Sequence, residues 1–190
     1  MKVSRERAAA SRERILDVAS KLFREHGLDG IGVADLMNAA GLTHGAFYGH
    51  FSSKEDLMAK ACIRALADSV AHWAKLSASA DGKPLSAIVK SYLSKRHRDN
   101  PGAGCAVAAL GADASRHDSA VRQAITEGVR SLVDVLTRVV PGKTRAAKRG
   151  KALATYASMV GALVLARAVD DAELSDEILK AVAASIEAAT

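Results

Sequence analysis

The segment between Gly41 and Leu57, with the sequence GLTHGAFYGHFSSKEDL, concentrates the side chains of this chain that are best suited to binding. Aromatic residues make up only 4% of the chain, yet three of them stand within five positions here. The aromatic and basic residues of the segment are His44, Phe47, Tyr48, His50, Phe51 and Lys54. Glycines separate these residues, and the segment is too short and too polar to form a core. We expect a surface that binds a ligand.

Gly41 lies where a helix-turn-helix would place its turn. Residues 33–40 and 44–50 have the length and apolar spacing of two short helices, and a glycine between them suits a tight turn. Phe47 and Phe51 are expected to pack inward. The residues expected to face outward are Thr43, His44, Gly45, Tyr48 and His50. Such an exposed helix face suits double-stranded DNA.

Each exposed residue of this second helix has an expected role. Thr43 is placed to cap the helix, whose free amides can approach a phosphate or a base edge. Gly45 and Gly49 each cost about 1 kcal/mol of helix propensity, which is explained if the backbone comes close to the groove. His44 is expected to face a base, and the phosphate contacts are assigned to Tyr48, His50 and Lys54. The alternative is that these last three side chains only cover the surface.

The same segment closely resembles the DNA-binding signature of the TetR/AcrR family of bacterial transcriptional regulators. The matching elements are Gly41, Phe47-Tyr48, His50-Phe51 and Ser53-Lys54-Glu55, and the resemblance covers about the first third of the chain from near Ser11. Two positions depart from the family: Gly32 replaces a hydroxyl residue, and His44 replaces a small or basic one. The resemblance therefore implies the binding mode and not the operator sequence. The candidate DNA-binding residues are Gly32, Val33, Thr43, His44, Gly45, Tyr48, His50 and Lys54.

Helical periodicity runs through almost the whole chain, so we expect an all-α protein of about nine helices. The first helix should begin near Ser11, and a capping box of Ser52 and Glu55 should begin a long helix that ends near Leu76. Later helices are expected at about 84–98, 104–114, 118–139, 144–169 and 175–188. We divide the chain into a helix-turn-helix domain with a basic N-terminal arm, 1–54, and a helical domain, 55–190. The resemblance implies that the second domain binds an effector and dimerises.

The charge and cysteine content limit the class of protein. A net charge of +6, with five basic and two acidic side chains among residues 1–14, favours a polyanionic partner. Two cysteines are too few for a disulfide framework, and no secretory leader opens the chain, so we expect a cytoplasmic protein. The uncharged run 152–166 is shorter than the roughly 20 residues that a membrane span needs. We expect no membrane association.

Aromatic and polar residues of the central helices predict an effector pocket. The candidate effector-binding residues are Trp73, Tyr92, His97, Cys105, Tyr156 and Met159, although each of them is also compatible with core or surface. Cys105 is expected in the first turn of a helix, where the helix dipole stabilises a thiolate. Its segment also resembles a subgroup of the family in which such a cysteine senses electrophiles or oxidants. The alternative is an inert, buried cysteine, which is what we expect of Cys62.

The sequence favours a regulator over an enzyme. The six histidines have no metal-ligand spacing with the cysteines, and neither a phosphate-binding loop nor a nucleophile–base pair is visible, so we expect no catalysis, metal or cofactor. The last two helices are apolar enough to form a homodimer. The expected function is that of a dimeric repressor, released from operator DNA by a small molecule or a reactive signal. Alternatives are an architectural DNA-binding protein without an effector, and a helical enzyme.

Overall fold

The computed structural model describes residues 2–189, with side chains described from residue 5, and within that range it is all-helical. The all-α prediction is confirmed. The helices are α1 (Lys2–His26), α2 (Val33–Ala39), the 3-10 helix η1 (His44–Gly49), α3 (Lys54–Ser79), α4 (Pro84–Tyr92), α5 (Lys95–Asp99), the 3-10 helix η2 (Pro101–Ala103), α6 (Ala106–Ala114), α7 (Ser119–Val139), α8 (Arg145–Ala168) and α9 (Ala172–Ala188).

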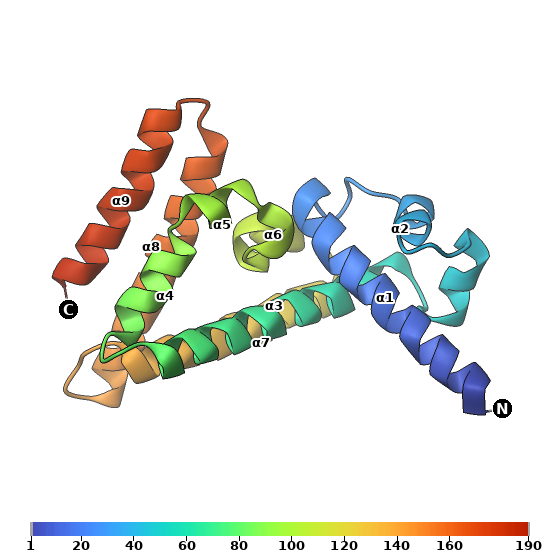
Figure 1. Ribbon diagram of the computed structural model, residues 1–190, viewed down its shortest axis with the longest axis horizontal. Helices are drawn as coiled ribbons and strands as arrows, with labels where there is room; N and C mark the ends of the chain where they lie inside the picture. Colours follow the sequence, from blue (N-terminus) through green and yellow to red (C-terminus); the bar gives the residue numbers. More distant parts are fainter. Residues whose placement is uncertain (1, 190) are drawn as a thin grey trace.

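The helices form an elongated molecule with α1, α2 and η1 at one end and the α8–α9 hairpin at the other (Figure 1). The long helices α3 and α7 lie side by side and connect the two ends. Gly128 of α7 permits this close packing, because a Cβ atom there would lie 2.7 Å from Cβ of Leu66 on α3. None of the described helices is both long and apolar enough to cross a membrane.

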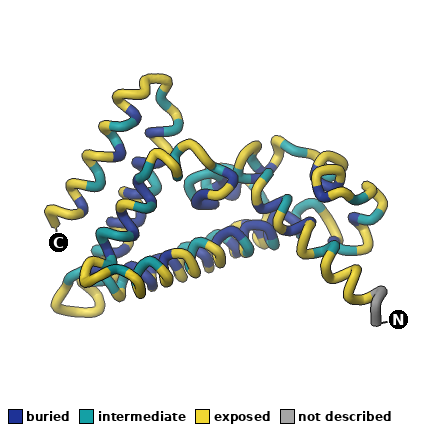
Figure 2. Tube along the Cα trace, in the orientation of Figure 1, coloured by how far each residue is buried: buried dark blue, intermediate teal, exposed yellow. Residues whose placement is uncertain are grey.

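Two clusters of buried residues form the core, and Figure 2 shows them as the inward-facing sides of the helices. The N-terminal cluster contains Phe23, Phe47 and Leu57, together with Leu110 of α6 and Val121 of α7. The DNA-binding end therefore does not complete its core alone. It shares buried surface with the helices that follow, and burying such side chains contributes about 1.5–3 kcal/mol each. The division at residue 54 remains a proposal.

The first helix begins much earlier than expected. α1 begins at Lys2 instead of near Ser11, because residues 5–10 are alanines, arginines and a glutamate that favour helix. The segment expected to be a basic arm is therefore the first part of α1. The side chain of Lys2 lies outside the described residues.

The cap of α3 is shifted by one residue from the expected Ser52–Glu55 pair. Ser53 is the N-cap: its Oγ accepts a hydrogen bond from the amide of Asp56 at 3.0 Å, and Oδ2 of Asp56 accepts one from the amide of Ser52 at 3.2 Å. Asp56 thus supplies the carboxylate that was expected from Glu55. Glu55 is free to contact another part of the chain.

Three later helix boundaries also differ from expectation. The helix expected at 84–98 is broken into α4 and α5, because the Oγ of Ser94 accepts from the amide of His97 and begins a new helix. The helix expected at 104 begins at Ala106. The last helix begins at Ala172 instead of Ser175, because the carboxylate of Asp171 accepts from the amides of Glu173 and Leu174.

Candidate nucleic-acid interface and effector cavity

The turn between α2 and η1 depends on Gly41. Its φ of +68° is left-handed, its amide donates to the carbonyl of Asn38, and the amide of Leu42 donates to that of Met37, both at 2.9 Å. These two bonds form a Schellman motif, which satisfies the last carbonyls of α2 and reverses the chain. A residue with a side chain is strained at this φ. The turn therefore has the geometry that the sequence predicts.

The second element of the motif is a 3-10 helix and not the α-helix expected from the sequence. The amide of Ala46 donates to the carbonyl of Thr43 at 3.0 Å, three residues back. Two glycines within six residues weaken a regular α-helix, and short helical segments readily take the tighter form. Thr43 occupies the N-cap, but its side chain makes no capping hydrogen bond. The expected side-chain cap is therefore wrong.

Inward and outward residues of η1 are clearly separated. Phe47 is 1% exposed, and its ring stacks on that of buried Phe51 with centroids 5.7 Å apart. Tyr48 is 69% exposed. Thr43, His44 and Gly45 are also exposed, whereas His50 and Lys54 are half-buried at the end of the element and the start of α3. Gly32 is the N-cap of α2 and Val33 its first residue. DNA contact by these eight residues remains a prediction.

Packing within the protein does not explain Gly45 and Gly49. A Cβ atom at either position would meet nothing within 4 Å, and neither has a positive φ. Alanine is therefore sterically compatible with the folded chain at both sites. A requirement for glycine, if there is one, comes from a partner that approaches this backbone.

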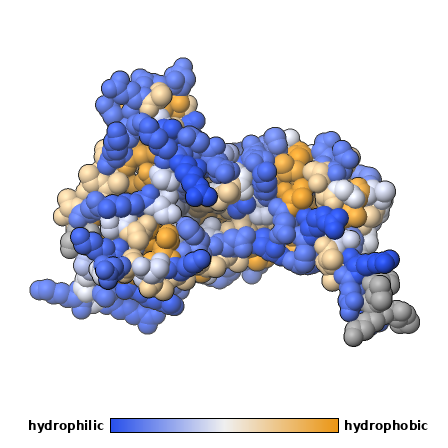
Figure 3. Space-filling model, in the orientation of Figure 1, coloured by the Kyte–Doolittle hydropathy of each residue, from blue (hydrophilic) through white to orange (hydrophobic). Residues whose placement is uncertain are grey.

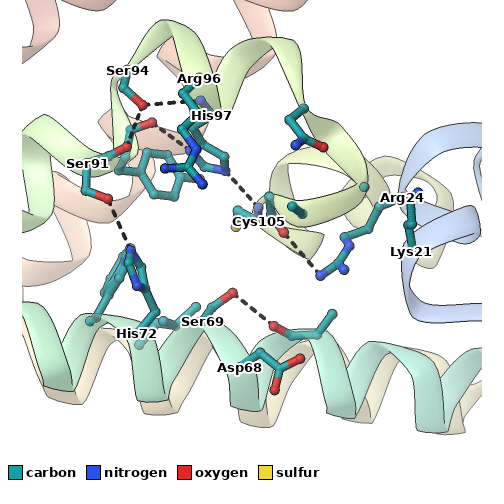
Figure 4. Close-up of a pocket in the computed structure, with 18 residues that line it drawn as sticks. Lys21, Arg24, Asp68, Ser69, His72, Ser91, Ser94, Arg96, His97 and Cys105 are labelled. Atoms are coloured by element: carbon teal, nitrogen blue, oxygen red, sulfur yellow. Dashed lines mark hydrogen bonds between the residues drawn. The ribbon is translucent and has the colours of Figure 1, made fainter. Parts of the chain in front are cut away.

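A cavity of about 930 Å³ lies between α1, α3, the α4–α5 region and the segment before α6 (Figure 4). Four of the expected effector residues line it: Trp73, Tyr92, His97 and Cys105. Tyr156 and Met159 do not line it. Both are buried in the core behind it, where Oη of Tyr156 lies 3.6 Å from Sγ of Cys105. The sequence identified the aromatic wall of this cavity but placed two core residues of α8 in it.

Four charged residues also line the cavity. They are Lys21, Arg24, Asp68 and Arg96. Lys21 and Arg24 belong to α1, in the part of the chain assigned to DNA binding. Only the folded arrangement brings them to the cavity, because their positions lie more than forty residues before Trp73.

His97 is held neutral by two hydrogen bonds with the backbone. Its Nε2 accepts from the amide of Cys105 at 2.9 Å, so Nε2 carries no proton, and Nδ1 donates to the carbonyl of Tyr92 at 2.7 Å. Burial lowers the pKa of His97, and the nearby guanidinium of Arg167 lowers it further, although the bond to Tyr92 opposes this. His97 therefore positions the segment before α6 and adds no positive charge to the cavity.

The two cysteines occupy different environments. Cys105 is 4% exposed, lines the cavity and is the N-cap of α6, one residue before the first turn in which it was expected. Cys62 is buried in the N-terminal core, and burial raises its pKa to about 11. A reagent that enters the cavity can reach the wall that contains Cys105. Cys62 lies in the core, as the sequence predicts.

The α8–α9 hairpin presents apolar side chains outward. On the face seen in Figure 3, hydrophobic surface appears in several separate areas. The exposed large apolar residues of the hairpin are Leu153, Val164, Leu165 and Leu174. The apolar stripe of α9, from Ile178 to Ile186, packs inward instead. No group of three or more potential metal ligands occurs in the part of the chain that the structure describes.

Comparison with known proteins identifies the N-terminal residues. Residues 15–61 match the family described as bacterial regulatory proteins, tetR family. The chain is similar to the HTH-type transcriptional regulator AcrR of Shigella flexneri, with 39% identity over 57 residues, which are 30% of this chain and 26% of that protein. It is also similar to TtgR of Pseudomonas putida, with 33% identity over 91 residues, 47% of this chain and 43% of that one. The matched segments span less than two thirds of either relative.

Solved structures extend the likeness of the fold to nearly the whole chain. The reduced form of Escherichia coli NemR superposes with a TM-score of 0.80 at 22% identity, covering 94% of this chain and 96% of that one. A TetR-family regulator from Agrobacterium tumefaciens gives a TM-score of 0.78 at 24% identity, covering 94% and 98%. At these identities the superpositions concern the fold alone.

Proposed function

We propose that this chain, a TetR/AcrR-family member by its N-terminal domain, is a dimeric, sequence-specific DNA-binding repressor of transcription that an effector releases from its operator. The observation that carries this proposal is the exposed face of η1, where Thr43, His44, Gly45 and Tyr48 stand outward over a buried Phe47. It lies within the residues that match the family. Such a protein acts in the cytoplasm.

The exposed face divides into groups that read bases and groups that hold phosphates. The start of η1 has free amides and no bulky side chain at Gly45, which suits close approach to the floor of the major groove. Tyr48 and Lys54 stand farther along, where they suit phosphate oxygens. So few base contacts give modest specificity in one protomer.

A homodimer doubles these contacts. The exposed Leu153, Val164 and Leu165 of α8 and Leu174 of α9 support a dimer through the last two helices, because large apolar side chains at the surface are stabilised by burial in a partner. Two η1 elements would then contact two half-sites of a palindromic operator. The exposed side of α8 carries this part of the proposal.

The effector acts in the cavity beside α3. Two kinds of effector fit its lining: a small molecule bound against Trp73 and Tyr92, or an electrophile or oxidant that reacts with Cys105. To release the protein from DNA, either effector must favour one of two conformations. Its affinity must be higher for the conformation that cannot bind DNA than for the conformation that can. Because α3 lines the cavity and follows directly after η1, a shift of α3 changes the spacing of the two η1 elements.

Selection of bound fragments from genomic DNA, followed by footprinting, tests this function. A repressor protects a palindromic site with two half-sites about one helical turn apart. An architectural DNA-binding protein, the alternative, protects DNA without sequence preference. Uniform protection at all fragments would exclude the proposed function.

Lys54→Ala gives a second reading of the same interaction. Loss of the lysine side chain should weaken DNA binding similarly on all sequences. The slope of the logarithm of the binding constant against the logarithm of the salt concentration should fall in magnitude by about 1, because one phosphate contact is removed. Lys75→Ala, at an exposed position near the far end of α3, is the matched control and should leave the slope unchanged. An unchanged slope in both variants removes Lys54 from the phosphate contacts.

A further inference from the structure

Arg24 carries a charge that the protein leaves without a counterion. Its guanidinium extends from α1 into the cavity towards Cys105 (Figure 4), and Nη1 donates to the carbonyl of Gly104 at 3.2 Å. Nε is buried and has no hydrogen-bond partner. Of the five N–H donors of the guanidinium, only one, on Nη1, has an acceptor among the described residues.

Burial disfavours the charged form of this side chain. Desolvation lowers the pKa of Arg24, and the negative charge of Asp68 is the largest electrostatic contribution that opposes this shift. Among the described residues, Arg24 forms no salt bridge with any carboxylate. A partly buried charge without a partner is costly, so a site of this kind favours an anion.

The other polar groups of the cavity favour negative charge as well. Lys21 and Arg96 are exposed cations at its wall, and Asp68 is the carboxylate among the lining residues. The charge of Lys21 is partly offset by Glu25, whose Oε1 lies 3.9 Å from Nζ of Lys21. The N-terminus of α6 also reaches this wall at Cys105 and has no side-chain cap, so its positive end is available to a ligand. His97 is neutral and does not change the net charge of the cavity lining.

The rest of the cavity suits a flat apolar group. Trp73 and Tyr92 lie edge to face with centroids 5.8 Å apart, and Leu132 lines the same wall. Among the described residues, the buried hydroxyl of Tyr92 has no hydrogen-bond partner. A cavity of about 930 Å³ is large enough for a small ligand that has an apolar body and one charged end.

From these groups we infer that the effector is a small aromatic carboxylate whose charged group binds the guanidinium of Arg24 while its ring lies against Trp73 and Tyr92. This inference rests on the proposed function and adds the chemical class of the effector. A carboxylate that binds both Nη atoms replaces the carbonyl of Gly104, which now holds Nη1. Binding therefore loosens the link between α1 and the segment before α6, and that link joins the DNA-binding end to the cavity.

Paired acids and amides test the inference on the full chain. Benzoate, cinnamate and 2-naphthoate are compared by isothermal titration with benzamide, cinnamamide and 2-naphthamide, which keep the ring and lack the charge. We expect each acid to bind about tenfold or more tightly than its amide, as a charge-assisted bidentate contact predicts. Equal binding of acids and amides, or no binding of any acid, would overturn the inference.

Variants locate the preference at Arg24. Arg24→Gln should remove the preference for acids, whereas Arg122→Gln, at an exposed position of α7 outside the cavity lining, should keep it. Asp68→Asn should strengthen acid binding, because it removes a carboxylate that lines the same cavity. Retention of the acid preference in Arg24→Gln would overturn the role of Arg24. If Arg24→Gln does not fold, the affinity of Asp68→Asn for the acids tests the inference instead. Weaker acid binding in Asp68→Asn would contradict the inference.

Operator binding by the ligand-free protein separates this inference from the function on which it rests. If the operator is bound but acids are not preferred, only the inference fails. If acids are preferred but no operator is bound, the proposed function fails and the anion site remains. If the protein binds its operator and also prefers acids, a saturating concentration of acid should weaken operator binding by a factor of about 5 or more.

Discussion

Nδ1 of His117 lies 3.0 Å from Oε1 of Glu55, which joins the turn between α6 and α7 to the first turn of α3. The other ring nitrogen lies 3.4 Å from Oδ2 of Asp29, and the side chain is only 8% exposed. In the last turn of α6, Asp113 accepts a hydrogen bond from the amide of Leu28 at 3.3 Å. The α6–α7 region is thus tied to the loop after α1 and to the start of α3.

Replacing His117 should weaken this connection. His117→Ala removes a partly buried hydrogen bond with Glu55 and a contact with the exposed Asp29, so we expect the free energy of unfolding to fall by about 1–3 kcal/mol in urea denaturation. Arg116→Ala on the same turn is the control. Its salt bridge with Asp113 is exposed, and we expect a change below about 1 kcal/mol. Equal effects of the two variants would show that the buried contacts of His117 do not stabilise the protein.

Gly45→Ala should separate folding from DNA binding. A methyl group at this position meets no protein atom, so thermal stability should be unchanged or slightly raised. Operator affinity should fall if the backbone approaches the groove, as measured by fluorescence anisotropy. Gly150→Ala on α8 is the control, because its Cβ is equally free and far from η1. Full operator affinity in Gly45→Ala would exclude close approach at this residue.

The stability of the protein should fall in mild acid because of His97. Its pKa is lowered in the folded state, mainly by burial, so the unfolded chain takes up a proton first as the pH decreases. The stabilisation is complete above the ordinary histidine pKa of about 6.5 and is lost below it. His97→Gln should flatten this part of the stability profile. An unchanged slope in His97→Gln would show that His97 does not cause this pH dependence.

The two thiols should differ in reactivity. N-ethylmaleimide should modify native protein at Cys105, which lines the cavity, and spare Cys62, whose pKa burial raises to about 11. Mass spectrometry of wild type and Cys105→Ser measures the number of adducts. Modification of Cys62 in the folded protein would contradict this assignment. If Cys105→Ser is still released from DNA by electrophiles and oxidants, Cys105 is not the sensor.

Leu165 should contribute to the dimer. It is 56% exposed on α8, so Leu165→Glu should shift the protein to monomers in sedimentation velocity without loss of helix content. Ile63→Glu on α3 is the control, since Ile63 is similarly exposed but lies away from α8 and α9. A dimer that persists in Leu165→Glu places the interface elsewhere.

Several elements could be predicted because their determinants lie close together in the chain. The Schellman turn needs only Gly41 and its neighbours, and the helix caps at Asp118 and Thr144 need only the following turn. The inward position of Phe47 and Phe51 follows from helical spacing. The prediction of the α3 cap was wrong because two adjacent serines, Ser52 and Ser53, can both serve as an N-cap. The prediction for η1 was wrong because its glycines favour a 3-10 helix.

The cavity could be predicted only in part. Aromatic residues such as Trp73 and Tyr92 are recognisable in any sequence, but whether they line a cavity or a core depends on which side of each helix meets its neighbours. Tyr156 shows the difference, because its ring contacts Trp73 and yet lies behind the cavity wall. The sequence by itself determined the helical fold, the turn and the exposed face of η1, since these depend on residues within a few positions of one another. Tertiary structure decided that Arg24 and His117 join the two ends of the molecule, because their partners Gly104 and Glu55 are 80 and 62 residues away along the chain.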